Sequence, residues 1–319
     1  MKALVFNKEL SFDTNYPKPV PKENEALIRI THAGICNTDV EITKGYMGFT
    51  GICGHEFLGI VEEINAVDKS LLHKRVTGGI NLGCHNCRDC ASGLERHCKN
   101  RQTLGIYKKD GCFAEFITLP LSNVVEIPQE ISDNEAILIE PLAAALEILE
   151  QVHIEPNSKI AVLGDGKLGL LISMVLSTTP ADVITIGKYQ NKLDILNKQG
   201  MKTKLLEDAT EEKCYDIVVE ATGSVSGFEK SVSLTKPRGI LVLKSTIASE
   251  KPLNLSMIVV DEITIVGSRC GQFPPAIRLL KKKPFDLSPL ISEVYPFDDA
   301  LNAFKKAQEK GVLKVILKF

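Results

Sequence analysis

Lys159-Ile-Ala-Val-Leu-Gly-Asp-Gly-Lys-Leu-Gly169 is the segment that indicates the fold most clearly. Its first five residues form a short apolar run, the rest carries three glycines, and Leu170–Leu176 continue as an apolar segment. A buried strand that ends in a glycine turn and leads into a helix is typical of the start of a βαβ unit. The stretch therefore predicts the first strand of a parallel sheet.

The three glycines have the G-x-G-x-x-G spacing of dinucleotide-binding turns. Gly164 would allow the tight turn, Gly166 would let a pyrophosphate approach the backbone, and Gly169 would let the helix pack against the strand. The pyrophosphate would lie at the helix N-terminus, where N–H groups are unpaired. We expect Lys167 and Leu168 to contact the dinucleotide as well. A glycine turn that binds nothing is the alternative.

The segment after the next expected strand indicates which dinucleotide binds. Units that bind NAD usually place Asp or Glu there, about twenty residues beyond the glycines. This chain has Gly187-Lys-Tyr-Gln-Asn-Lys192 instead, without a carboxylate. Lys188 and Lys192 could pair with a 2′-phosphate beside Gly187, which favours NADP over NAD. The alternative is that the lysines belong to a solvated turn.

The spacing of hydrophobic residues divides the chain into two parts. Up to about Pro128, short alternating strands with glycine turns predict a β-barrel or sandwich. After Pro141, short apolar strands alternate with helices, which predicts a parallel sheet covered on both faces. The expected strands are Lys2–Phe6, Glu25–His32, Phe57–Ile64 and Cys112–Thr118 in the first part, and Lys159–Leu163, Val183–Ile186, Tyr215–Val219, Ile240–Leu243 and Ile263–Val266 in the second.

Four cysteines, Cys84, Cys87, Cys90 and Cys98, form a C-x2-C-x2-C-x7-C cluster. Four thiolates on one short loop suit a structural Zn²⁺ ion, which prefers four sulfur or nitrogen ligands and no open position. Two disulfides are the alternative. The apolar run in Met1–Glu9 is too short for an export signal, and the chain has nine cysteines, an odd number. We therefore expect reduced thiols and a cytoplasmic protein.

Composition limits the partners. The chain of 319 residues has a net charge of -2 and is 44% hydrophobic, which is ordinary for a globular protein with two cores. It lacks the basic surplus of a nucleic-acid-binding zinc ribbon, and charges or turn residues interrupt every apolar stretch long enough to cross a membrane. A small-molecule partner is therefore favoured over nucleic acid or a membrane.

Further residues with metal-binding chemistry are scattered along the first part of the chain. His55 and Glu56 are adjacent and follow Cys36 by about twenty residues, and Glu140 precedes the second part. One thiolate, one imidazole and one or two carboxylates form a mixed set of the kind that catalytic zinc uses with an open position. Taken singly, these could be a core cysteine, a turn histidine and a carboxylate at a helix start.

Several short motifs together resemble one family. Cys36-x-Thr-Asp39, Gly54-His-Glu-x-x-Gly59, the four-cysteine loop, the glycine turn and Val218-Val-Glu-Ala-Thr-Gly223 occur in the order seen in zinc-dependent medium-chain dehydrogenases/reductases. The resemblance covers essentially the whole chain. It looks closest to the branch that includes sorbitol, threonine and glucose dehydrogenases, in which a Glu-Pro-Leu motif replaces the third-ligand cysteine of liver-type alcohol dehydrogenases.

The resemblance implies roles for individual residues. Cys36, His55, Glu56 and Glu140 match the ligands of a catalytic zinc, which gives two zinc ions per chain with the four-cysteine site. Thr38 matches the hydroxyl that receives the substrate proton, and Asp39 a carboxylate that orients the metal histidine. Thr222 and Gly223 are further expected coenzyme contacts.

The resemblance also implies a fold of the α/β class. We expect a GroES-like catalytic barrel over residues 1–141, a Rossmann coenzyme domain over 142–270 and a return to the catalytic domain over 271–319. A helix that starts in Tyr295–Ala300 and a closing strand at Leu313–Leu317 fit that return. Members are usually dimeric or tetrameric, so we expect a homo-oligomer.

Some positions depart from the family. Liver-type relays end in a histidine where this chain has Glu41, and the segment before the zinc loop reads Leu72-His-Lys-Arg-Val76. Compressed segments are expected to line the substrate pocket, so the family resemblance does not identify the substrate. Tyr46 and Phe49 are candidates for its walls, or for barrel core.

Three functions fit these patterns to different degrees. The first is a zinc-dependent oxidoreductase that transfers a hydride between an alcohol or ketone and NADP. A zinc-free quinone or enoyl reductase of the same superfamily would have no ligand set and no cysteine loop. A non-enzymatic NADP-binding or redox-sensing protein would have damaged catalytic positions, whereas all of them are intact.

Overall fold

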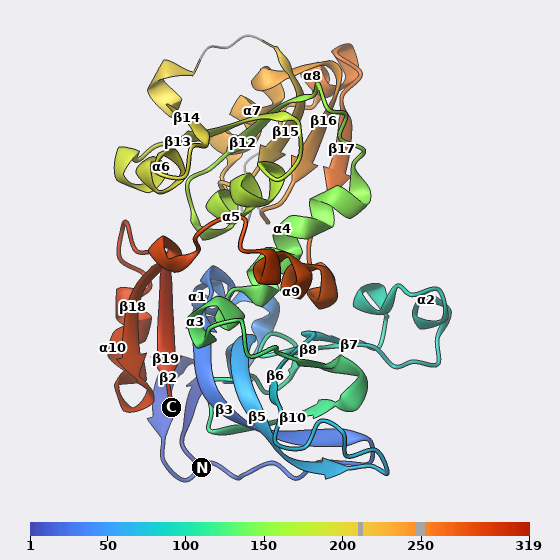
Figure 1. The fold of residues 1–319 in the computed structure, drawn as a ribbon, viewed down its shortest axis with the longest axis vertical. Helices are drawn as coiled ribbons and strands as arrows, with labels where there is room; N and C mark the ends of the chain where they lie inside the picture. Colours follow the sequence, from blue (N-terminus) through green and yellow to red (C-terminus); the bar gives the residue numbers. More distant parts are fainter. Residues whose placement is uncertain (210–212, 247–252) are drawn as a thin grey trace. The chain divides into compact units, whose positions relative to one another are not determined.

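The structure is a computed structural model that describes residues 1–209, 213–246 and 253–319. These residues form two compact units (Figure 1). The first unit comprises residues 1–140, 277–281 and 290–319, and the second comprises residues 141–276 and 282–289. In the described ranges, no helix has both the length and the apolar character that a membrane span requires.

The first unit is built on one mixed sheet. Its strand order is β11-β6-β5-β3-β19-β18, and β10 also pairs with β3. The central strands carry its core, with Leu27, Ile28 and Ile30 of β3 buried. The strands of this sheet are β3 (Glu25–Ile35), β5 (Glu56–Asn65), β6 (Arg75–Gly78), β10 (Phe116–Pro120), β11 (Val124–Glu126), β18 (Ile291–Pro296) and β19 (Lys314–Lys318).

Two small sheets complete the strands of this unit. One has the order β2-β1-β4 and the other β7-β8-β9. Their strands are β1 (Ala3–Asn7), β2 (Glu9–Asp13), β4 (Gly51–Ile52), β7 (Asn81–Leu82), β8 (Gln102–Leu104) and β9 (Lys108–Lys109). The second of these sheets flanks the loop that carries the four cysteines.

The helices that lie wholly in the first unit are short. They are α1 (Asn37–Thr43), α2 (Arg88–Ala91), α3 (Asp133–Ile137) and α10 (Ala300–Lys306), with the 3-10 turns η1 (Tyr46–Gly48), η2 (Glu95–His97), η3 (Leu121–Asn123) and η6 (Phe297–Asp299). Helices α4 (Ile139–Gln151) and α9 (Phe273–Lys282) and the turn η5 (Ser288–Leu290) lie where the chain passes from one unit to the other.

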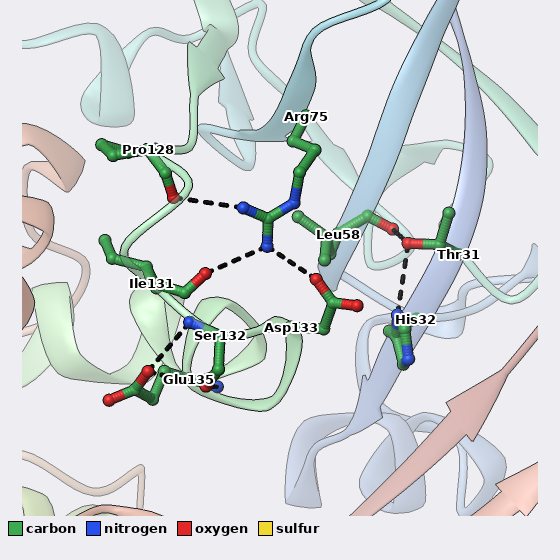
Figure 2. Close-up of polar contacts among 9 residues, drawn as sticks. All are labelled: Thr31, His32, Leu58, Arg75, Pro128, Ile131, Ser132, Asp133 and Glu135. Carbon is green, nitrogen blue, oxygen red and sulfur yellow. Dashed lines mark hydrogen bonds and ion pairs between the residues drawn. The ribbon is translucent and has the colours of Figure 1, made fainter.

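Arg75 holds the segment that leads into α3 and α4. Its guanidinium donates to the carbonyls of Pro128 and Ile131 at 3.1 Å each and pairs with Asp133 at 2.6 Å (Figure 2). Ser132 then starts α3 with a capping box, in which its side chain accepts from the Glu135 N–H. The arginine therefore fixes the backbone a few residues before Glu140.

The second unit contains a six-stranded parallel sheet in the order β14-β13-β12-β15-β16-β17. All five pairings are parallel, and the order reverses between β12 and β15, as in doubly wound dinucleotide-binding sheets. The expected α/β class is thereby confirmed. The strands are β12 (Lys159–Leu163), β13 (Asp182–Gly187), β14 (Lys202–Leu205), β15 (Tyr215–Glu220), β16 (Thr235–Leu243) and β17 (Thr264–Gly267).

Helices lie against this sheet and bury its apolar strands. Ala161, Val218 and Leu241 of the central strands pack with Phe228 and Val232 of α7 in one core cluster. The helices are α5 (Lys167–Leu176), α6 (Gln190–Asn197), α7 (Val225–Leu234) and α8 (Ser256–Val260), with the turn η4 (Leu206–Asp208).

Most expected strands lie within a few residues of the observed ones. The strand expected at Cys112–Thr118 begins only at Phe116. Cys112 and Phe113 are fully buried, but their N–H groups donate to the carbonyls of Gly54 and Cys53 in a loop. The helix expected to start within Tyr295–Ala300 does so: β18 ends at Pro296, the 3-10 turn η6 begins at Phe297, and α10 begins at Ala300. The late start of the expected strand at Cys112 reflects residues that are buried without pairing in a strand ladder.

Candidate functional site

Cys36 and Asp39 are fixed by the start of α1. Cys36 is the N-cap residue that follows β3, and its backbone N–H donates to Asp39 Oδ2 at 2.8 Å. Asp39 is fully buried, and its Oδ1 accepts the Gly54 N–H at 3.1 Å. A single carboxylate therefore ties the end of β3 to the turn before His55.

His55 and Glu56 enter the same region from the start of β5. The two residues are only 3% and 1% exposed, so both polar side chains are shielded from solvent. His55 Nδ1 lies 3.3 Å from Asp39 Oδ1, although this contact does not meet hydrogen-bond geometry. Burial alone would lower the pKa of His55, but Asp39 and Cys36 raise it well above its ordinary value. With Asp39 facing Nδ1, Nε2 is the nitrogen available to a metal.

The structure brings three expected ligands together. One ligand atom from each of Cys36, His55 and Glu56 lies within 4.8 Å of the others. Thr38 Oγ1 is 3.8 Å from Cys36 Sγ, and Thr38 is half-buried. Glu56 Oε1 is buried and has no hydrogen-bond partner. Because an unpartnered buried carboxylate oxygen is costly, this oxygen and the mixed donor set fit a metal ion.

Lys314 is a residue of this site that the sequence did not identify. Its Nζ pairs with Glu56 Oε2, and the two side chains are 2% and 1% exposed. Burial lowers the pKa of Lys314, but Glu56 and Cys36 outweigh it and raise the pKa overall. A lysine inside the apolar strand β19 was the available signal, since lysine is almost never fully buried unless paired.

Glu140 and Glu41 are two further residues that the family resemblance singled out. Glu140 is in the first turn of α4 and is half-buried, outside the set that converges within 4.8 Å in the described residues. Its role as a ligand stays a prediction. Glu41 stands where liver-type relays have a histidine, and it pairs with Lys44 at 3.0 Å on the surface of α1.

The four cysteines of the loop between β7 and β8 also converge. Their sulfur atoms lie within 4.8 Å of one another, with Cys87 Sγ 3.5 Å from Cys90 Sγ and Cys98 Sγ 3.5 Å from Cys84 Sγ. The Asn86 backbone N–H lowers the pKa of Cys84 to about 7, whereas burial raises that of Cys90 to about 12. Four thiolates this close need a cation, so this cluster also fits a metal ion.

The glycine turn has the geometry expected for a pyrophosphate. Gly164 has φ +129°, and a Cβ on Gly169 would lie 2.1 Å from the Gly164 carbonyl oxygen, so helix and strand pack at the limit that glycine allows. A Cβ on Gly166 would have no neighbour within 4 Å. The backbone before Lys167 and Leu168 is therefore open to a ligand at the N-terminus of α5.

Thr222 and Gly223 follow β15, the neighbour of β12. Their backbone N–H groups donate to Glu220 Oε1 at 2.6 and 3.2 Å, as does the Thr222 hydroxyl at 2.6 Å. Glu220 is fully buried. Glu220 therefore shapes this turn, and its role is a second one that the sequence did not identify.

Lys188 and Lys192 flank the turn between β13 and α6. Lys188 is exposed, and Lys192 Nζ lies 5.0 Å from the centre of the Tyr189 ring. The backbone N–H groups of Lys188 and Tyr189 both donate to Asp165 Oδ2 at 2.7 Å. Asp165 comes from the glycine turn, and no sequence pattern indicated this contact.

The two residues considered as pocket walls differ in exposure. Tyr46 is 37% exposed on η1, whereas Phe49 is 8% exposed. Phe49 lines a hollow of about 360 Å³ together with Met47, Tyr107 and Asp110. Their contact with a substrate stays a prediction.

Known proteins match along the whole chain. Residues 22–129 match the alcohol dehydrogenase GroES-like domain, and residues 134–319 match the glucose dehydrogenase C-terminus. The chain is 26% identical over 321 residues to the sorbitol dehydrogenase of Halalkalibacterium halodurans, with 94% of this chain and 93% of that protein covered. It is 31% identical over 245 residues to an L-threonine 3-dehydrogenase of Rhizobium etli, with 74% and 70% covered.

A solved structure has the same fold. It is that of a protein from Sinorhizobium meliloti assigned as a zinc-binding dehydrogenase and bound to NADP. The TM-score is 0.91 at 25% identity, with 100% of this chain and 99% of that chain covered. The chain therefore belongs to the alcohol dehydrogenase superfamily of medium-chain dehydrogenases/reductases, and it is an oxidoreductase of the alcohol dehydrogenase type.

Proposed function

We propose that the chain is a zinc-dependent dehydrogenase that transfers a hydride between an alcohol and NADP(H). The substrate class is a secondary alcohol, a polyol or a sugar-like alcohol. The observation that carries the proposal is the convergence of Cys36, His55 and Glu56 within 4.8 Å. A zinc-free reductase of this superfamily would not require such a ligand set, and a protein without catalytic activity would not be expected to retain it.

Cys36, His55 and Glu56 would hold the catalytic zinc, with Glu140 as a further candidate. When bound, zinc supplies Lewis-acid chemistry that lowers the pKa of an alcohol hydroxyl towards neutrality. Asp39 acts on the imidazole: its carboxylate faces Nδ1 and keeps the proton there. The half-buried Thr38 hydroxyl takes the proton that the alcohol loses.

Coenzyme binding is assigned to the glycine turn and its neighbours. Gly164, Gly166, Lys167, Leu168 and Gly169 would hold the pyrophosphate, with Thr222 and Gly223 beside them. The nicotinamide ring, when bound, accepts the hydride. The lysines at 188 and 192 favour NADP; of two structural relatives with a TM-score of 0.91, one was solved with NADP and one with NADH.

The cluster of Cys84, Cys87, Cys90 and Cys98 would bind a second, structural zinc. All four positions would be filled by sulfur, so this ion has no place for a substrate. Its function is to hold the surface loop that contains α2 and η2.

The substrate class rests on the relatives. Sorbitol dehydrogenase and L-threonine 3-dehydrogenase, by their names, oxidise compounds with a secondary hydroxyl group. Tyr46 and Phe49 are proposed as pocket residues.

We also propose a homodimer or homotetramer. Strand β17 is an edge strand of the parallel sheet, and Val259 and Val260 of the adjacent α8 are 76% and 71% exposed. An edge strand beside exposed apolar side chains is a typical interface. Light scattering after gel filtration tests this, and a monomer at micromolar concentration would contradict it.

A screen of alcohols, polyols and sugars with NADP⁺ tests the proposed reaction. The absorbance of the reduced coenzyme should rise with at least one secondary alcohol or polyol, and the KM for NADP⁺ should be lower than that for NAD⁺. Reduction of quinones or enones by a zinc-free preparation, without alcohol oxidation, would refute the proposal.

A further inference from the structure

The carboxylate of Asp165 lies at the carboxyl end of β13, although Asp165 belongs to the loop after β12. Both backbone bonds that it accepts, from the Lys188 and Tyr189 N–H groups, are 2.7 Å long. Asp165 is only 8% exposed. In the described residues its Oδ1 takes part in no hydrogen bond.

The parallel pairing of β12 and β13 explains how it reaches this position. Leu163 is in register with Ile186, so the loop after β12 and the turn after β13 are neighbours. Gly187 provides the room, because a Cβ there would lie 2.7 Å from Asp165 Cβ and 2.9 Å from Oδ2. The glycine at 187 and the aspartate at 165 are therefore complementary.

In dinucleotide-binding sheets, residues at the carboxyl end of the second strand recognise the 2′ position of the coenzyme ribose. A carboxylate at the end of the second strand accepts the ribose 2′-hydroxyl of NAD, and basic groups there accommodate a 2′-phosphate. The β13 turn itself has no carboxylate, but Asp165 supplies one beside Lys188. Oδ2 also occupies two backbone N–H groups at the start of α6, which would otherwise be available to an anion.

We propose that Asp165 is a specificity-determining residue for the 2′ position of the coenzyme. Its carboxylate accepts the ribose hydroxyl of NAD(H) and repels the 2′-phosphate of NADP(H), whereas Lys188 attracts that phosphate. The chain therefore binds both coenzymes, and Asp165 limits the preference for NADP(H). This inference rests on the proposed function.

A purely structural role for Asp165 predicts a different outcome in the Asp165→Asn variant. The amide oxygen can still accept both backbone bonds, so the turn is kept, but the charge is lost. Lys188→Gln is the matched variant, because it removes the opposite charge from the same turn. Thermal unfolding checks that both variants remain folded.

The test uses the full zinc-loaded chain and calorimetric titration with 5′-AMP and 2′,5′-ADP, which differ by the 2′-phosphate. For Asp165→Asn we expect the affinity for 2′,5′-ADP relative to 5′-AMP to rise about tenfold, because a repulsive charge is removed. For Lys188→Gln we expect the same ratio to fall by about tenfold.

Two results would overturn the inference in distinguishable ways. An equal change of both affinities in Asp165→Asn, or no change, would make Asp165 a structural residue only and leave the proposed function intact. Binding of neither nucleotide by the unmodified chain would refute the proposed coenzyme site and this inference with it.

Discussion

Lys314 Nζ and Glu56 Oε2 form an ion pair that is almost completely removed from solvent. The two residues lie 258 positions apart in the chain, in the closing strand β19 and in β5. Gly34 of β3 allows their approach, because a Cβ there would lie 2.5 Å from Glu56 Oε2 and 3.3 Å from Lys314 Cδ. The end of the chain thus contacts a proposed metal ligand directly.

We predict that Lys314→Met destabilises the protein by about 3–5 kcal/mol, because it leaves the Glu56 charge buried without its partner. Urea unfolding measures the effect. The double variant Lys314→Met with Glu56→Gln should regain part of the loss. Lys318→Met, at an exposed position of the same strand, is the control, and equal stability of the two single variants would contradict the prediction.

His55→Ala should abolish alcohol oxidation while coenzyme affinity is retained. The imidazole belongs to the first unit, whereas the glycine turn belongs to the second. Activity assays and calorimetric titration with NADP⁺ measure the two properties separately. His153→Ala, which changes an exposed histidine, should behave like the unmodified chain. Loss of coenzyme binding together with turnover would count against the assignment of the two sites to different units.

Cys90→Ser should cost stability and local order more than chemistry, since the four-cysteine site has no position for a substrate. Limited proteolysis should cut the loop between β7 and β8 faster, and unfolding should occur at a lower temperature. Cys214→Ser, outside both cysteine sets, is the control. A stable Cys90→Ser variant with selectively lost activity would show that the cluster has a catalytic role.

His32 should contribute a loss of stability as the pH drops from about 7 to 5. Burial lowers the pKa of His32, with Lys318 and Arg75 adding to the effect and Asp133 opposing it. Below the ordinary histidine pKa of about 6.5 the unfolded chain binds a proton that the folded chain resists, so acid favours unfolding.

His32→Gln tests this by urea unfolding at several pH values. The variant should lose less stability than the unmodified chain between pH 7 and 5, by at most about 1.4 kcal/mol per pH unit for a single proton. His153→Gln should leave the dependence unchanged. If His32→Gln and the unmodified chain have the same pH dependence, the shift at His32 is absent.

The sequence predicted those parts of the fold that depend on local pattern. The glycine turn after Lys159–Leu163 and the cysteine spacing each specify their geometry within one short segment of the sequence, and the structure has both. Cys36 and His55 could be grouped only through the family resemblance, because their approach depends on the fully buried Asp39.

Contacts made by packing of distant segments were not predictable in this way. Lys314 and Asp165 each act on residues brought close by strand pairing, through β19 beside β3 and β13 beside β12. In neither case does the local sequence predict the contact. Gly187–Lys192 contains no carboxylate, and the carboxylate that lies beside this turn comes from another loop.

The zinc content of the purified chain and of two variants is the decisive test of the two proposed metal sites. Elemental analysis should find about two zinc ions per chain in the unmodified protein. Cys36→Ser should hold about one and be inactive, whereas Cys90→Ser should hold about one and retain turnover while it remains folded. A folded, active protein without zinc would contradict the proposal that alcohol oxidation by this chain depends on zinc.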